Sequence, residues 1–242
     1  MSAVNEALIR DVVSEVLGRL GHSPASSPAS APVPPPVGGA SCNCHATPGS
    51  AVRGTFGVFA DAGQACEAAH EAYLQLQSKG VEARRKIVDI VKGMAEAKAE
   101  EWGRLELDES KIGRLDHKIE KLKIIKLVPG VEWLRPDALS GDHGITLEEY
   151  TPFGVVGAVT PSTHSIPTLS GNIVNIAAAG NAVVFNAHPA ASRCAAVAVR
   201  AFNQAIHRET GIENIACIIE SPSFDTFKQM CAHDLVRLLL VT

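Results

Sequence analysis

Two groups of polar residues in this chain have side chains that could bind a nucleotide cofactor. Each group follows a short apolar segment, GVVGAV in one case and NAVVF in the other. Their hydroxyl, amide and imidazole groups can hydrogen-bond ribose hydroxyls or polarise a carbonyl oxygen, so we expect a cofactor site without a metal ion. The first group is Thr160, Pro161, Ser162, Thr163 and His164, and the second is Asn186, His188 and Pro189.

The apolar segments before these groups are predicted to be strands of one parallel sheet. Four such strands, at 154–160, 181–185, 212–221 and 235–241, alternate with helices at 169–180, 190–207 and 223–233. Strands that are apolar throughout and joined by helices are typical of a sheet covered on both faces. The predicted fold class is α/β, with a Rossmann-like parallel sheet, and ligands bind at the carboxyl ends of its strands.

Other patterns describe the surroundings of this sheet. Gly154 and Gly157 flank the first apolar strand, which predicts a tight turn or the close approach of a neighbouring element. Apolar residues recur at helical spacing from about residue 64 to 126, which predicts helices there. The basic stretch 111–126 is typical of a solvated helix face, although contact with the phosphates of coenzyme A is an alternative.

The first 53 residues differ in character from the rest. Val4–Leu20 place apolar residues on one helical face and charged residues on the other, so an amphipathic helix is expected at 1–21. Residues 22–53 are rich in Pro, Ala and Ser and are expected to form a disordered linker. Its CNCH motif could be a metal site, but we interpret it as exposed thiols because it lacks a second ligand cluster. The third domain is then 54–242.

Composition excludes several classes of protein. The net charge of −4 provides no basic surface for nucleic acid, and no apolar run is long enough to cross a membrane. The chain has six cysteines at irregular spacing, which is typical of reduced thiols inside a cell. A cytoplasmic protein is therefore expected.

The stretch TPFGVVGAVTPSTHSIPTLSGNIVNIAAAGNAVVFNAHP, residues 151–189, resembles the cofactor-binding core of the aldehyde dehydrogenase superfamily. That family's pattern is P-x-G-V-V-G, then P-W-N-x-P, then A-A-G-N-x-V-V-x-K-P. The TPST turn replaces the tryptophan-containing turn and resembles the CoA-acylating members. Members found in bacterial microcompartments also carry an N-terminal amphipathic helix on a proline-rich linker, and the resemblance extends over 54–242.

The resemblance implies roles for both polar groups. The turn at 160–163 would hold the nicotinamide ribose, and Thr163 or His164 would stand near the oxyanion formed from the aldehyde, where the family has asparagine. Asn186 replaces the family's lysine at the adenine ribose, which favours NAD over NADP because a neutral amide does not attract a phosphate. His188 would contact the ribose or the nucleotide of coenzyme A, or would simply begin a helix before Pro189.

FADAGQACEA, residues 59–68, resembles the family's nucleophile motif, F-x-x-x-G-Q-x-C. It lies nearly a hundred residues before the cofactor turn, whereas the family's nucleophile lies after it. Asp61 is a plausible helix N-cap, and Cys66 takes helical spacing with Ala69 and Tyr73, so we interpret Cys66 as a small core residue. Cys194, Cys217 and Cys231 are interpreted in the same way, which leaves no nucleophile in these segments.

We therefore expect the N-terminal part of a CoA-acylating aldehyde dehydrogenase, which converts an aldehyde, CoA and NAD to an acyl-CoA and NADH. The chain alone is expected to be inactive, and the full-length enzyme is expected to be a homo-oligomer inside a bacterial microcompartment. The alternative is a non-catalytic module that docks to shell or cargo proteins through Val4–Leu20. A Rossmann-like reductase is disfavoured, because TPST stands where G-x-G-x-x-G would be expected.

The last segment, LVRLLLVT, reads as a strand that needs cover on both faces. Leu238, Leu239 and Leu240 would have to be buried against neighbours that this chain supplies only in part. We expect an exposed, sticky sheet edge and poor solubility at this length.

Overall fold

The computed structural model describes residues 56–242. The helix predicted at 1–21 and the linker predicted at 22–53, with its CNCH motif, lie outside the described residues.

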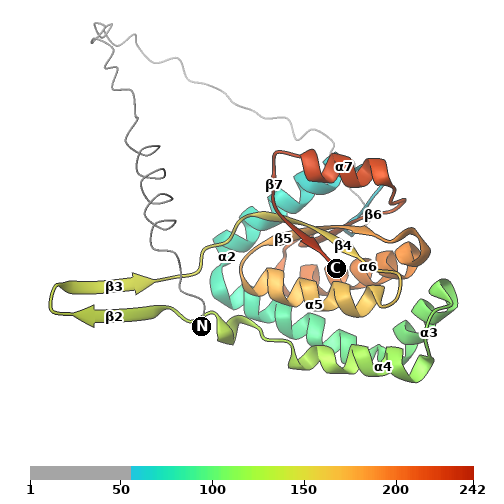
Figure 1. Ribbon diagram of the computed structural model, residues 1–242, viewed down its shortest axis with the longest axis horizontal. Coiled ribbons are helices and arrows are strands. Elements are labelled where there is room, and N and C mark those ends of the chain that lie inside the picture. The colour runs from blue at the N-terminus through green and yellow to red at the C-terminus, as the bar shows by residue number, and fades with distance from the viewer. Residues whose placement is uncertain (1–55) are drawn as a thin grey trace, which may run out of the picture. The chain divides into compact units, whose positions relative to one another are not determined.

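A five-stranded, wholly parallel sheet forms the centre of the described segment, as the alternation of strands and helices predicted (Figure 1). The strand order is β1-β6-β5-β4-β7, so β4 is flanked by β5 on one side and by β7 on the other. The strands are β1 (Val58–Phe59), β4 (Val155–Thr160), β5 (Ala182–Ala187), β6 (Ala216–Ile219) and β7 (Val236–Val241).

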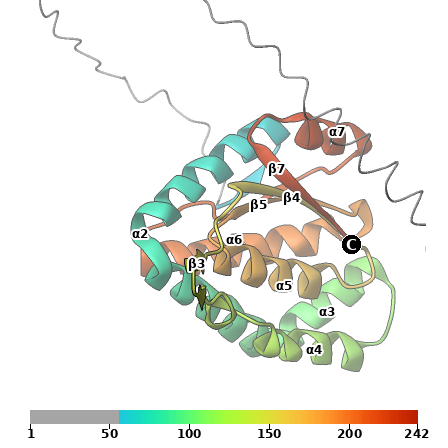
Figure 2. The same ribbon diagram turned by 60° about the vertical axis from the view of Figure 1, so that its left-hand side comes forward.

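Helices cover both faces of this sheet (Figures 1 and 2). One face carries α7 (Phe224–Ala232), whereas α5 (Ser165–Ala178) and α6 (Ser192–Thr210) lie on the opposite face. Beyond α5 and α6, a further layer is formed by α3 (Ala99–Ser110) and α4 (Leu115–Lys123). The connection after β5 packs on one face and the connection after β6 on the other, which makes the sheet doubly wound.

The long helix α2 (Ala62–Ala97) and its successors occupy the stretch predicted to be helical. Asp61 is the N-cap of α2 and accepts a hydrogen bond from the Gln64 N–H at 2.9 Å, as predicted. The helix is interrupted at Gly80, whose φ of 71° is not helical. Two short 3-10 helices, η1 (Ile124–Leu127) and η2 (Val131–Trp133), follow α4.

Of the two glycines predicted to flank the first apolar strand, Gly154 precedes β4 and Gly157 lies within it. A Cβ on Gly157 would lie 2.9 Å from Leu239 Cδ2 on β7 and 3.3 Å from Met230 Cε on α7, so close packing requires glycine there. Gly154 instead adopts a φ of +117°, which side chains disfavour. The Asn181 side chain accepts hydrogen bonds from the N–H groups of Phe153 and Gly154, which fixes the entry of the chain into β4.

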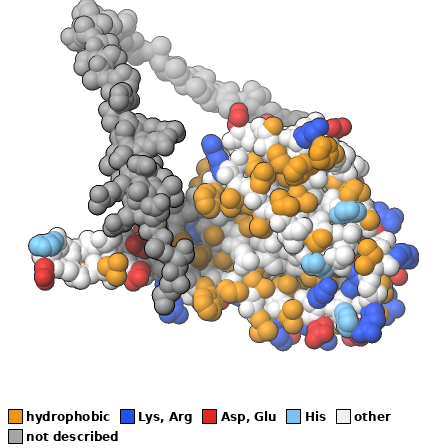
Figure 3. Space-filling view, in the orientation of Figure 1, with side chains coloured by type: hydrophobic (Ala, Val, Ile, Leu, Met, Phe, Trp, Pro, Cys, Tyr) orange, Lys and Arg blue, Asp and Glu red, His pale blue; other side chains and the backbone are white. Residues whose placement is uncertain are grey.

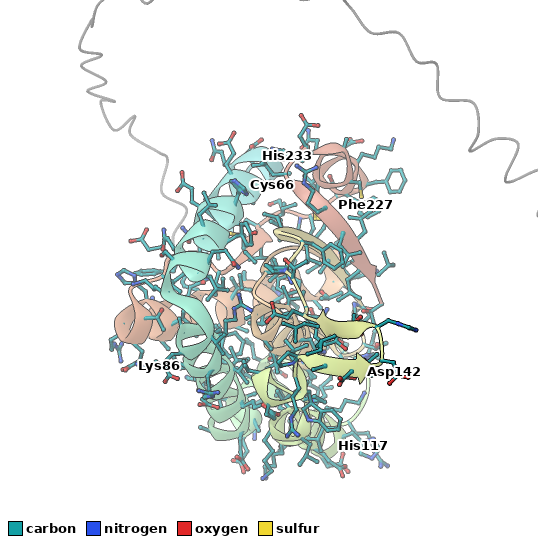
Figure 4. The ribbon with its side chains drawn as sticks, turned by 90° about the vertical axis from the view of Figure 1, so that its left-hand side faces the viewer. Cys66, Lys86, His117, Asp142, Phe227 and His233 are labelled. Atoms are coloured by element: carbon teal, nitrogen blue, oxygen red, sulfur yellow. The ribbon has the colours of Figure 1, made fainter. Side chains whose placement is uncertain are left out.

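An antiparallel hairpin, which the sequence patterns did not predict, extends away from the sheet (Figure 1). It consists of β2 (Asp137–Gly141) and β3 (Gly144–Glu148), and every residue of both strands is exposed. Asp142 lies at its tip (Figure 4). The signal is weak because each strand has only five residues and no side chain of the hairpin joins the core.

The final strand forms as predicted and lies at the edge of the sheet, paired only with β4. Leu238, Leu239 and Leu240 are exposed, and the first of them retains 44% of its accessible surface. Hydrophobic side chains gather over α7 and β7 on the face shown in Figure 3. No helix among residues 56–242 is both long and apolar enough to span a bilayer.

Candidate functional site

A pocket of about 480 Å³ lies at the carboxyl ends of β4, β5 and β7. Six of the eight residues that the sequence singled out line it, because parallel strands bring their carboxyl ends to the same edge. These residues are Thr160, Pro161, Ser162, Asn186, His188 and Pro189. Thr163 and His164 do not line it; they stand next to it, at the start of α5.

The helix α7 supplies the part of the pocket that the sequence analysis missed. Ser223, Phe224 and Phe227, at the amino-terminal end of α7, line the pocket. Phe227 is labelled in Figure 4. Ser223 and Thr226 form a capping box, because each side chain hydrogen-bonds the other residue's backbone N–H. The helix itself was predicted at 223–233 and is confirmed, but its place at the pocket was not predicted.

Asn186 is held in one orientation by the same helix. The Thr226 hydroxyl donates a hydrogen bond to Asn186 Oδ1 at 2.8 Å, and the asparagine is buried. Because the amide oxygen is engaged, the Nδ2 amino group is left as the donor available to a ligand. Asn186 therefore faces a ligand as a hydrogen-bond donor. The sequence alone does not predict this, because an asparagine side chain can donate or accept.

His188 combines the two roles that the sequence left open. It is exposed at the pocket, and its Nδ1 accepts a hydrogen bond at 3.1 Å from the N–H of Ala190, within the 3-10 helix η3 (Pro189–Ala191). An accepting Nδ1 places the proton of the neutral ring on Nε2. His188 thus begins a helical turn and still offers Nε2–H as a donor at the pocket.

The turn after β4, residues 161–164, is tied to the core at both ends. Thr160 and Ser165 are fully buried, with their hydroxyl oxygens 3.4 Å apart. Thr163 Oγ1 lies 2.7 Å from His164 Nδ1. Burial lowers the pKa of His164, and the positive charges of Lys121 and Lys118 lower it further. The neutral imidazole is therefore favoured beside the pocket.

Carboxylates of α3 hold the amino-terminal ends of both α5 and α6, neither of which has a side-chain cap of its own. Glu106 Oε1 accepts a hydrogen bond from the Ser165 N–H at 2.8 Å. Glu109 accepts from the N–H groups of Arg193 and Cys194 at 2.9 and 2.6 Å. Acidic groups are favourable at helix amino termini, where free N–H groups and the helix dipole point at them.

Lys118 corrects the interpretation of 111–126 as a solvated helix face. It is 2% exposed, its Nζ lies 3.1 Å from Glu106 Oε1, and it donates to the Thr163 carbonyl oxygen at 3.1 Å. The other lysines of this stretch are exposed, as predicted; they are Lys111, Lys121, Lys123 and Lys126. Lys118 is the one lysine of this stretch that faces inward, because α4 packs against α3 and α5, and charge alone does not reveal which lysine is buried.

The cysteines of the described segment lie in surroundings that do not favour a nucleophilic thiolate. Cys66, Cys194 and Cys217 are buried, and burial raises the pKa of each thiol, to about 12 for Cys66. Burial also raises the pKa of Cys231, which is less deeply buried. A raised pKa leaves little reactive thiolate at neutral pH. No group of three or more His, Cys, Asp or Glu among residues 56–242 could hold a metal ion.

The doubly wound parallel sheet places the described segment among the open α/β proteins, in which ligands bind where the connections diverge to opposite faces, and the pocket lies at that point. The sequence comparison is more specific. The model of the aldehyde dehydrogenase family matches residues 53–242, and the chain belongs to that family.

Relatives within the family act on small aldehydes. An acetylating acetaldehyde dehydrogenase from Salmonella typhimurium is 37% identical over 187 residues, 77% of this chain. The alignment covers 40% of the relative, so the chain spans less than half the length of the curated relatives it matches.

Two solved structures share the fold and more than a third of the aligned sequence. A propionaldehyde dehydrogenase from a Clostridium phytofermentans fucose utilisation microcompartment is 39% identical, with a TM-score of 0.75, over 77% of this chain and 43% of its own. An engineered glycolyl-CoA reductase with bound NADP+ is 36% identical, with a TM-score of 0.75, over 78% of this chain and 44% of its own.

Proposed function

We propose that this chain is the nucleotide-binding part of a CoA-acylating aldehyde dehydrogenase, which converts a small aldehyde, CoA and NAD to an acyl-CoA and NADH. The observation that carries the proposal is the pocket, which joins the two predicted polar groups at one sheet edge. Membership of the family and the acetylating relative support the reaction class. When bound, NAD would supply the hydride acceptor.

The residues that line the pocket fit a dinucleotide better than a metal or a polyanion. Phe224 and Phe227, with ring centroids 6.1 Å apart, provide an apolar wall for a base. Asn186 Nδ2 and the Ser162 hydroxyl can donate to ribose oxygens. Pro161 and Pro189 keep the backbone at the two strand ends rigid.

The choice of NAD over NADP rests on charge. No Lys or Arg of residues 56–242 lines the pocket, and the nearby Lys228 lies 4.8 Å from the centre of the Phe224 ring. A 2′-phosphate is usually bound by a cationic side chain, most often arginine. The NADP+ held by one solved relative makes a direct comparison of the two cofactors the informative measurement.

Thr163 and His164 are assigned to the oxyanion side of the reaction. His164 is half-buried, and its pKa is lowered by burial, so the ring stays neutral and can donate one N–H to a developing negative charge. Thr163 Oγ1 contacts its Nδ1 and orients the ring. The aldehyde itself would be attacked by a thiolate, and no cysteine of the described segment is suited to that step.

Binding and turnover of the 242-residue chain test this proposal together. We expect calorimetry to detect NAD+ binding that is tighter than NADP+ binding, and we expect no NADH from acetaldehyde, CoA and NAD+. Replacing the buried Asn186 with leucine should weaken NAD+ binding by about tenfold, since one hydrogen bond to a neutral partner is lost. Asn175→Leu, on the exposed surface near the carboxyl end of α5, is the matched control. Equal loss in both variants, or tighter NADP+ binding, would contradict the assignment.

The partners follow from the same proposal. We assign the full-length enzyme to a bacterial microcompartment in the cytoplasm, because a close structural relative comes from one. A homo-oligomer is supported by the exposed hairpin, where Ile145 and Leu147 stand on one face at 78% and 63% exposure. The alternative role, docking to shell or cargo proteins through Val4–Leu20, depends on residues outside the described segment.

A further inference from the structure

The ion pair between Glu106 and Lys118 is buried so deeply that stability alone does not explain it. The side chains come from α3 and α4, their charged atoms lie 3.1 Å apart, and their side chains are 0% and 3% exposed. Desolvation of two charges offsets most of their attraction, and apolar replacements of such pairs are often neutral or stabilising. The other contacts of the two side chains therefore have to explain why the buried pair is present.

Each charged group makes its other contact at the same place, the start of α5. Glu106 Oε1 accepts from the Ser165 N–H at 2.8 Å, and Lys118 Nζ donates to the Thr163 carbonyl oxygen at 3.1 Å. The carboxylate and the ammonium group thus hold the backbone on either side of His164. His164 is the N-cap of α5, and its own side chain makes no capping hydrogen bond.

The held segment is the one to which the proposed function assigns the reacting end of the site. With the Thr163 carbonyl and the Ser165 N–H fixed, the backbone of His164 has little freedom, so its imidazole keeps one place beside the pocket. A shift of about 1 Å in such a group can cost roughly a hundredfold in rate. Buried supporting contacts are the usual means of preventing that shift.

We propose that Glu106 and Lys118 are positioning residues, which hold the Thr163–His164 segment against the nicotinamide end of a bound dinucleotide. They act through the backbone and touch no reactant themselves. This inference rests on the proposed function, since it assumes that the nicotinamide end of the cofactor reaches the turn after β4. The adenosine end would be bound by Asn186 and α7, which the pair does not contact.

The test replaces the pair with apolar residues of similar volume in the full 242-residue chain. Glu106→Leu combined with Lys118→Met should lower the melting temperature only modestly, because better apolar packing offsets part of the lost contact with the Ser165 N–H. Binding is compared for two probes, NAD+ and ADP-ribose, which differ only in the nicotinamide. We expect NAD+ binding to weaken about tenfold, because the displaced Thr163–His164 segment no longer fits the nicotinamide end, with ADP-ribose binding unchanged.

The control and a second variant keep the outcome interpretable. Lys98→Met with Glu101→Leu removes an exposed pair of the same residue types, 3.0 Å apart at the start of α3, and should change neither affinity. Lys118→Met alone keeps the Glu106 contact with Ser165, because that buried carboxyl can take up a proton instead. It should fold and should lose less NAD+ affinity than the double variant does.

Amide hydrogen exchange is a third measurement. It reports how firmly the backbone around His164 is held when no ligand is bound. In the double variant, exchange at Ser165 should accelerate at least tenfold, since its charge-assisted partner is lost, while amides of β5 stay protected. Wild-type chain that binds neither probe would disprove the cofactor site, and exchange at Ser165 would then decide the positioning claim alone. Unchanged exchange, or equal changes for NAD+ and ADP-ribose, would refute it.

Discussion

At the scale of single residues, the surroundings of His164 favour the neutral form of its imidazole. A histidine has an unperturbed pKa near 6.5, so about a quarter of such side chains carry charge at pH 7. Here burial lowers the pKa, and Lys121 and Lys118 add to the effect. A neutral ring donates one N–H and accepts at the other nitrogen, which suits the proposed contact with an oxyanion.

Titration of the imidazole tests this directly. Removing the charge of Lys121 by Lys121→Gln should raise the pKa of His164, because a repelling cation no longer opposes protonation. Lys123→Gln is the matched control, since that exposed lysine is not among the groups that shift His164. The pKa is read from imidazole chemical shifts against pH. An unchanged pKa in the Lys121 variant would show that the charge does not reach the ring.

The residue types of the site were predictable, whereas their supporting contacts were not. Thr160, Ser162, Asn186 and His188 follow apolar strands, and sequence pattern alone predicted that they would share an edge. Nothing in the letters LELDES of α3 indicated that Glu106 would contact Ser165, which is 59 positions away. Such a contact depends on how helices pack, and a sequence pattern records only neighbours along the chain.

At the scale of elements, α3 organises the starts of two other helices. Glu106 and Glu109 are three residues apart, so they project from the same side of α3, and they reach α5 and α6 respectively. Both helices follow strands that end at the pocket. The helix α3 therefore joins the starts of the two helices that follow the polar groups after β4 and β5.

Loss of the second carboxylate should destabilise the segment measurably. Glu109→Ala removes the partner of two backbone N–H groups of α6, and we expect a loss of about 1 to 2 kcal/mol in the free energy of unfolding. Urea denaturation of the chain provides the measurement. Glu101→Ala, on the exposed face of the same helix, should change stability by less than about 0.5 kcal/mol. Equal effects would mean that the cap contributes nothing.

At the scale of the whole described segment, two exposed apolar surfaces are available for contacts with other chains. One is the edge strand β7 with α7, where Leu238 and Phe224 are exposed, and the other is the hairpin of β2 and β3. A sheet edge with apolar side chains pairs readily with other chains. The hairpin offers a defined, two-stranded surface that suits a specific contact between copies.

Light scattering after gel filtration distinguishes the two surfaces. Leu238→Lys should reduce irregular aggregation, because a lysine on an edge strand discourages pairing. Ile145→Glu with Leu147→Glu should instead lower the mass of a discrete oligomer, since charges replace the exposed apolar pair. Leu74→Glu, an exposed leucine of α2, should affect neither. A monodisperse monomer in the wild-type chain would disprove both expectations.

The sequence by itself determined the order of strands and helices from β4 onward, the two polar groups at strand ends and the core position of Cys66. These features follow from local periodicity, caps and apolar runs, which neighbours along the chain specify. Only the tertiary structure decided that α7 completes the pocket, that β7 is an edge strand and that Lys118 is buried with Glu106. Those facts depend on the strand order and on helix packing, which join residues far apart in the chain.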